Sequence, residues 1–102
     1  MFSTTLTNRT ESPSLTYTRC RVGGRDYGLN TIWILDIRSA TDLTVDLQNS
    51  GQVGWVKTMG QEIPIYDLAG RMRLKRPRFD PQQHRIILIN AKPHFGVLVE
   101  SL

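Results

Sequence analysis

The sequence predicts an all-β domain, formed from one or two small β-barrels with one short helix. Three observations support this class. Short stretches of alternating apolar and polar residues recur along the chain, and this is the period of a half-buried strand. Glycines separate consecutive stretches, as they do in hairpins. No stretch has a helical period long enough for a helix bundle. Successive hairpins in 102 residues are typical of a single small barrel-like domain.

The first hairpin is predicted around Gly23 and Gly24. Arginines alternate with small or apolar residues through 18–22, and a second alternating stretch covers residues 25–31. Two consecutive glycines tolerate the positive φ angles that a two-residue primed turn requires. The sequence therefore predicts two antiparallel strands on either side of this turn.

The middle of the chain is less regular. Residues 32–37 are apolar on both faces, and this pattern is compatible with either a buried strand or a short helical turn. Residues 38–52 are rich in Asp, Ser, Thr, Asn and Gly and predict a connecting loop. Within this loop Leu43, Val45 and Leu47 alternate with polar residues, which indicates one short strand.

A second hairpin is predicted from Val53–Met59 and Ile63–Tyr66, with its turn at Gly60. Pro64 has no N–H to donate, so we expect the second arm at a sheet edge or at a bulge. Asp67 follows this arm and is typical of a helix start, because its carboxylate can accept a hydrogen bond from the first-turn N–H groups.

The predicted helix is short, and Leu68 and Met72, four residues apart, are expected to face the core. Two further strands are predicted after it, Arg85–Ala91 and Phe95–Glu100, joined by a turn at residues 91–94. Both strands are strongly apolar.

Composition and motifs exclude several classes of protein. The apolar runs are too short to cross a bilayer, so no membrane insertion is predicted. Residues 1–14 lack the apolar segment of a secretory signal and contain seven Ser or Thr, which predicts a flexible N-terminal arm before a single domain at 15–102. Cys20 and the two histidines are not spaced as zinc ligands, and Cys20 fits a core-facing strand position. We expect a cytoplasmic protein with no cofactor, metal or catalytic residue.

Four stretches together resemble the CheW family, the adaptor domains of bacterial chemosensory arrays. In that family an opening hairpin is followed by a V-x-E-I segment, a G-V-I-N-L-R-G-x-V-x-P-V-x-D-L motif, and a pair of strands that read R-I-I-V and V-G-L-L-V-D. The similar stretches here are Cys20–Leu29, Ile34–Ile37, Gly54–Leu68, and Arg85–Ile89 with Phe95–Ser101. Their order and spacing, from Arg19 to the C-terminus, carry the resemblance.

The resemblance implies a fold of two packed β-barrels and an adaptor without catalysis. Such domains link the signalling tips of chemoreceptors to the regulatory domain of the histidine kinase CheA, which has the same fold. Docking to other CheW-like domains is implied as well. The positions that match the family's protein-binding pattern are Ile34, Asp36, Gly54, Met59, Gly60, Ile87, Leu88 and Gly96.

Two departures from the family pattern bear on function. Met59 stands where the family has an Arg linked with receptor binding, and a thioether cannot make the forked, charge-assisted hydrogen bonds of a guanidinium. The chain also ends just after the last matching strand, whereas the family continues through further strands of the second barrel.

We therefore expect an incomplete second barrel, in which residues 86–89 and 97–99 present open edges and apolar faces. A partner, or a second copy of the chain in a homodimer, would close these surfaces. A compact single barrel that includes the last hairpin is the alternative architecture.

A basic stretch supports a competing hypothesis. Five cations lie close together in a chain of net charge +4, and they could contact the phosphates of a nucleic acid: Arg71, Arg73, Lys75, Arg76 and Arg78. No aromatic residue is interleaved among them for base stacking. A solvated helix end, or a docking patch for an acidic partner, is therefore favoured over nucleic-acid binding. A third hypothesis is a degenerate CheW-like domain that associates only with itself.

Overall fold

The computed structural model describes residues 16–48, 51–75 and 78–102. The arm predicted at 1–14 and Arg76 of the basic stretch lie outside these residues. The described part is mostly β, as predicted. Its strands are β1 (Tyr17–Val22), β2 (Arg25–Asn30), β3 (Ile34–Ser39), β4 (Thr44–Val45), β5 (Gln52–Thr58), β6 (Gln61–Asp67), β7 (Arg85–Ile89) and β8 (Phe95–Val99). Its helices are α1 (Leu68–Arg71) and two 3-10 turns, η1 (Thr31–Trp33) and η2 (Ala40–Asp42).

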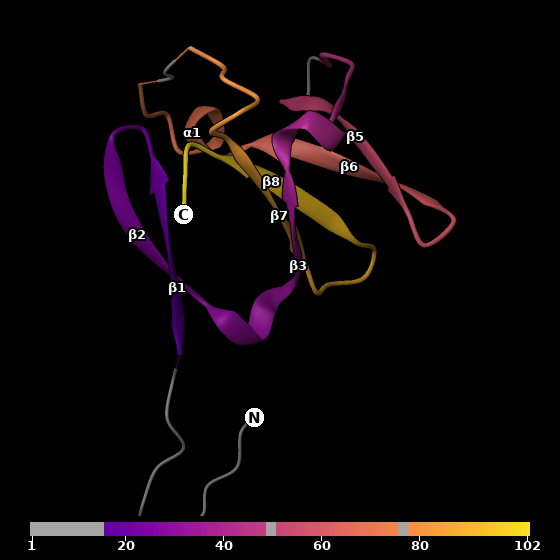
Figure 1. Cartoon of the computed structure of the whole chain (residues 1–102), viewed down its shortest axis with the longest axis horizontal. Helices are drawn as coiled ribbons and strands as arrows, with labels where there is room; N and C mark the ends of the chain where they lie inside the picture. Colours follow the sequence, from indigo (N-terminus) through magenta and orange to yellow (C-terminus); the bar gives the residue numbers. More distant parts are fainter. Residues whose placement is uncertain (1–15, 49–50, 76–77) are drawn as a thin grey trace, which may run out of the picture.

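The strands form two sheets (Figure 1). Strands β1 and β2 make a separate hairpin, and the other six are ordered β3-β7-β8-β6-β5-β4. Neighbouring strands are antiparallel, except that β6 and β8 run parallel. Among the described strands no ring closes through backbone hydrogen bonds. Neither sheet is therefore a closed barrel in the described residues, which agrees with the incomplete barrel expected from the sequence.

Both predicted hairpins are present. The turn between β1 and β2 has φ angles of 60° at Gly23 and 77° at Gly24, as a primed turn requires. The turn between β5 and β6 has the same form, with φ of 52° at Met59 and 70° at Gly60. Methionine rarely adopts a positive φ, and the turn therefore holds Met59 in a conformation that would suit glycine better.

Strands β7 and β8 form a wall between two apolar clusters. Ile86, Leu88 and Leu98 face the first cluster. Ile87 and Val97 face the second. The expectation that these strands present open edges was wrong: β7 pairs with β3 and β8, and β8 pairs with β7 and β6. Because both faces are covered, both strands need continuous apolar runs rather than alternation.

The second cluster is covered by the β1–β2 hairpin and by α1. Cys20 and Val22 pack into it from β1, so the predicted core position of Cys20 is confirmed. Two backbone hydrogen bonds tie the hairpin to the end of β8: Arg21 N–H donates to Ser101 O at 2.9 Å, and Glu100 N–H donates to Arg21 O at 2.8 Å. Segments from opposite ends of the chain thus meet in one cluster.

Residues 32–37 combine the two structures that their pattern left open. They begin in the η1 turn and continue as β3. Burial of the whole run is not observed, because Ile32 and Trp33 are 70% and 54% exposed, and only Ile34 packs against the second cluster. The short strand expected at 43–47 is reduced to β4, which is exposed.

Pro64 lies in an internal strand and not at the sheet edge or bulge that the sequence predicted. Strand β6 is internal, between β8 and β5. Pairing with β8 begins only at Ile65, so Pro64 has one neighbouring strand and its missing N–H interrupts no hydrogen-bond ladder.

Asp67 is the N-cap residue of α1 but makes no side-chain cap hydrogen bond. Met72 was expected in the core and is instead 40% exposed.

Gly54→Ala should destabilise the fold. The carbonyl oxygen of Thr44 in β4 occupies the space that a Cβ at Gly54 would take, so β4 would have to leave β5. We expect a loss of about 2 kcal/mol in the free energy of unfolding, measured by urea denaturation. Gly28→Ala is the control, because its Cβ would meet Tyr17 at an ordinary 3.5 Å. Equal stability of the two variants would contradict this packing.

Candidate protein-binding surface

The eight positions that match the family's binding pattern separate into an exposed and an enclosed group. Asp36, Met59 and Gly60 are exposed, and Ile34 is half-buried. Ile87 and Leu88 are fully enclosed in the two clusters. The two remaining glycines lie at close packing contacts. A Cβ on Gly96 would come within 2.7 Å of Ile65 Cδ1, and Gly54 lies against Thr44. The side chains of the enclosed group have no free surface to offer a partner.

Arg38 brings the exposed positions together. Its Nη1 donates to Thr58 Oγ1 at 3.1 Å, and its Nε donates to Asp42 Oδ2 at 3.0 Å. Asp36 Oδ2 lies 3.8 Å from the same Nη1. These contacts place β3 beside the end of β5. Asp36 therefore lies on one side of the Arg38 bridge, and the turn that carries Met59 lies on the other.

We call this region the β3–turn surface; it consists of Leu35, Asp36, Ile37, Met59 and Gly60. Its character is mixed, with an acidic group between apolar ones. Met59 is 61% exposed, and Leu35 and Ile37 are each 37% exposed. Asp36 Oδ1 accepts a hydrogen bond from Ile37 N–H at 2.8 Å, which fixes the carboxylate.

Strand β3 is also the edge of its sheet, with β7 as its one neighbour. An edge strand offers N–H and C=O groups for main-chain pairing, and the apolar side chains beside it can be buried by a partner. This arrangement is suited to binding protein.

The described residues of the predicted basic stretch have different surroundings. Arg71 lies over the ring of Tyr66, with its Cζ 5.2 Å from the centroid. Arg73 and Lys75 are exposed in the loop after α1. Arg78 lines a shallow hollow that also includes Asp80 and Glu100. Arg71 is thus engaged with an aromatic ring, whereas Arg73, Lys75 and Arg78 are exposed, and a joint basic patch stays a prediction.

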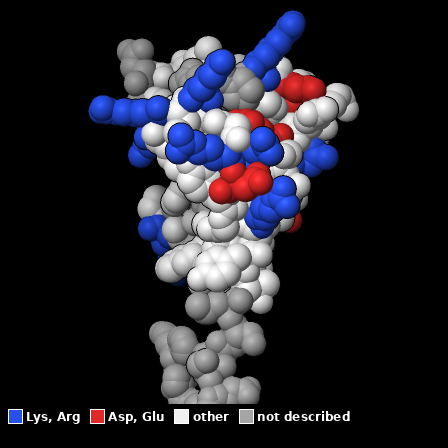
Figure 2. Space-filling model, turned by 90° about the vertical axis from the view of Figure 1, so that its left-hand side faces the viewer, with Lys and Arg blue, Asp and Glu red and all other residues white. Residues whose placement is uncertain are grey.

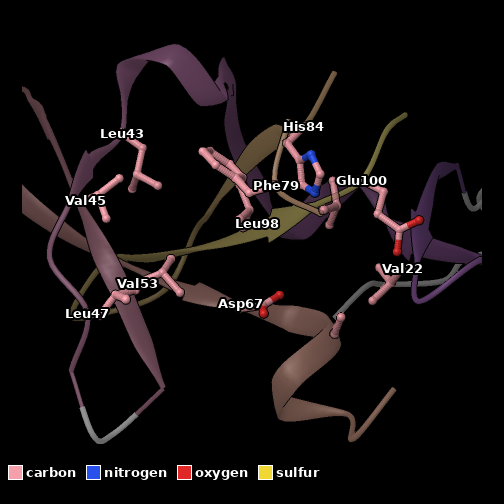
Figure 3. A pocket seen from close by; sticks show the side chains of 12 residues that line it. Val22, Leu43, Val45, Leu47, Val53, Asp67, Phe79, His84, Leu98 and Glu100 are labelled. Carbon is pink, nitrogen blue, oxygen red and sulfur yellow. The ribbon is translucent and has the colours of Figure 1, made fainter. Parts of the chain in front are cut away.

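A cavity of about 320 Å³ was not foreseen from the sequence (Figure 3). Apolar side chains from several strands line most of it, with Phe79 at one side. Its polar lining groups are Asp67, His84 and Glu100. Asp80 N–H lies 3.1 Å from His84 Nδ1 and can donate to it, which holds the imidazole in place. Its lining includes Leu98 of the first cluster and Val22 and Val99 of the second, so the cavity adjoins both.

Cys20 has the environment of an inert thiol. It is enclosed in the second cluster. Burial, followed by the negative charge of Asp26, raises the pKa of its thiol above the ordinary value of 9.0. A raised pKa disfavours the thiolate, which is the nucleophilic form.

Within the described ranges, no group of three or more His, Cys, Asp or Glu is placed to hold a metal ion, and no helix is long and apolar enough to cross a membrane.

Comparison with known proteins identifies the fold and the family. Residues 16–102 match the family model of the CheW-like domain. Curated protein sequences give no match. Among solved structures, the scaffolding protein TtCheW from Thermoanaerobacter tengcongensis is similar, with a TM-score of 0.73 and 18% sequence identity over 85% of this chain. The match covers 60% of TtCheW, so this chain spans less than two thirds of that protein.

The buried thiol should make stability fall at high pH. The folded-state pKa of Cys20 is raised, so its contribution is complete below the ordinary value of 9.0 and is lost as the pH rises through the folded pKa. Urea denaturation of the wild type and of Cys20→Ala across this range isolates the effect from other titrating groups. We expect the wild type's advantage to shrink above pH 9.0. A constant difference would show that the thiol is not buried.

Proposed function

The chain belongs to the CheW-like domain family, and from this premise we propose that it is a non-enzymatic adaptor of a bacterial chemosensory system. Its partners are the regulatory domain of a CheA-type histidine kinase and other CheW-like domains, and it acts in the cytoplasm. We assign it no reaction and no cofactor.

The Arg38 bridge is the observation that best supports this proposal. It joins Asp36 and Met59, which match the family's binding pattern but lie far apart in the sequence, into one exposed region. The free edge of β3 runs through the same region. Main-chain pairing at this edge and burial of Leu35, Ile37 and Met59 are the two contributions to affinity.

Met59 favours the kinase over the receptor as the partner. The family's Arg at this position can form two parallel hydrogen bonds to a carboxylate, and methionine can form none. Kinase docking through apolar contacts does not need that guanidinium. We therefore expect this adaptor to bind the kinase regulatory domain and to bind a receptor signalling tip weakly.

Light scattering after gel filtration tests the proposal directly. The protein is run alone, with the CheA regulatory domain, and with a receptor signalling hairpin. A complex with the kinase domain supports the proposal, and binding of the hairpin as well would mean that Met59 is tolerated. A self-dimer that binds neither partner would refute it and favour the degenerate, self-associating domain.

Asp36→Arg should weaken binding to the kinase regulatory domain by about tenfold. The substitution removes a fixed carboxylate from the centre of the β3–turn surface and adds a bulky cation beside the pairing edge. Asp46→Arg is the matched control, since Asp46 is an exposed acid outside this surface. Isothermal titration calorimetry gives both affinities. The same loss in both variants would place the docking site elsewhere.

Met59→Arg should strengthen binding to the receptor hairpin by about tenfold, because it restores a forked donor at an exposed turn position. Met59→Lys has the same charge without the fork and should gain less. Fluorescence anisotropy with a labelled hairpin measures both. A gain that is equal in the two variants would indicate a general charge effect instead.

A further inference from the structure

The turn between β1 and β2 packs tightly against the loop that follows α1. A Cβ on Gly23 would lie 2.5 Å from Leu74 Cβ, so no larger residue fits there without movement of the loop. Leu74 is held from the other side, because its N–H donates to Ala69 O at 2.9 Å and its side chain packs against the second cluster. The contact therefore fixes two segments that are distant in the sequence.

This contact gathers cations from both segments. Arg25 follows Gly23 by two residues, and Arg73 and Lys75 flank Leu74. All three side chains belong to exposed residues. In the part of the chain that the structure describes, none of the three forms an ion pair. Their positive charges are thus available to an external group.

The other charges at this end of the molecule are largely engaged. Asp26 pairs with Arg19 at 3.2 Å and with Arg21 at 3.5 Å. Glu100 accepts a hydrogen bond from Gly24 N–H at 3.2 Å. Figure 2, which views the side of the molecule that carries the β1–β2 hairpin, shows blue Lys and Arg side chains spread over this end, with fewer red acidic ones between them. The local balance is positive.

We propose that Arg25, Arg73 and Lys75 form a second docking surface, the hairpin–loop surface, which binds an acidic, extended segment of a partner protein. Exposed cations on two segments that meet at the Gly23–Leu74 contact attract such a segment and steer its approach. Met72, which is 40% exposed and precedes Arg73, supplies apolar contact for the segment.

A peptide fits this surface better than a nucleic acid does. Asp26 is the chain neighbour of Arg25, and Glu100 contacts Gly24 on the other side of it, so acidic groups beside this cation oppose a backbone that carries a phosphate at every nucleotide. A peptide can place its carboxylates only where the cations are. Single-stranded nucleic acid also gains affinity from aromatic stacking, and the two residues that flank Arg73, Met72 and Leu74, are not aromatic.

The surface is independent of the proposed kinase docking. It consists of residues from β2 and the loop after α1, whereas the β3–turn surface lies on β3 and the β5–β6 turn. An adaptor with two separate surfaces can hold two partners at once. The inference stands even if the kinase is not a partner.

A charge-matched pair of double variants tests the surface. The probe is a fluorescein-labelled peptide in which Glu alternates with Leu and Gly, and binding is followed by anisotropy. Arg25→Gln with Lys75→Gln removes two cations from the hairpin–loop surface. Lys57→Gln with Lys92→Gln removes two exposed cations elsewhere. We expect about tenfold weaker binding for the first pair and little change for the second.

Binding of the wild type should also weaken as salt rises from about 0.05 M to about 0.3 M, because exposed charges are screened. Equal losses in the two double variants would overturn the proposal, since only net charge would then matter. Tighter binding of single-stranded DNA than of the peptide would overturn it in favour of a nucleic-acid surface. Circular dichroism verifies that each variant is folded.

The kinase regulatory domain is titrated in parallel, so that failures can be told apart. Loss of peptide binding with kinase binding retained supports two independent surfaces. Loss of both in Arg25→Gln with Lys75→Gln, in a folded protein, would contradict the independence of the hairpin–loop surface and assign these cations to kinase docking.

Discussion

The burial of β7 and β8 on both faces is the constraint on which the rest of the structure depends. One face of this wall packs against residues of β5 and β6, and the other packs against the β1–β2 hairpin and α1. The hairpin, α1, β5 and β6 each cover one side of the wall. A strand pair with two apolar faces cannot be left half-covered in water, so the position of the hairpin, of α1 and of Leu74 follows from the need to enclose Ile87, Val97 and Val99.

Both proposed docking surfaces result from how that wall is covered. The six-stranded sheet bends until Arg38 can reach Thr58, and a polar side chain rather than a backbone ladder spans the remaining opening. This leaves β3 as an edge with exposed apolar residues. At the second cluster, the tight contact of Gly23 with Leu74 brings the segment that carries Arg25 against the segment that carries Arg73 and Lys75. Packing thus positions the charged and apolar groups that partners would recognise.

Local signals in the sequence were sufficient for the hairpins. Gly23 with Gly24, and Gly60, mark turns that need positive φ, and the alternation beside them marks strands. Contacts between distant segments could not be predicted in the same way. Nothing near Arg38 indicates Thr58 as its partner, and nothing near Gly23 indicates Leu74. The prediction of open edges for β7 and β8 failed for this reason: β7 pairs with β3, whose pattern was ambiguous between strand and turn, and β8 pairs in parallel with the distant strand β6.

The bridge between Arg21 and Ser101 also determines when folding can finish during protein synthesis. The two hairpins involve near neighbours and can form as soon as they leave the ribosome. Strands β7 and β8, which both clusters need, are synthesised after the other strands. Arg21 of β1 can form its hydrogen bonds with Glu100 and Ser101 only after those residues have been made. The nascent chain therefore carries Val22 and Ile34 without their apolar cover until β7 and β8 have been made, and such surface favours aggregation while it is exposed.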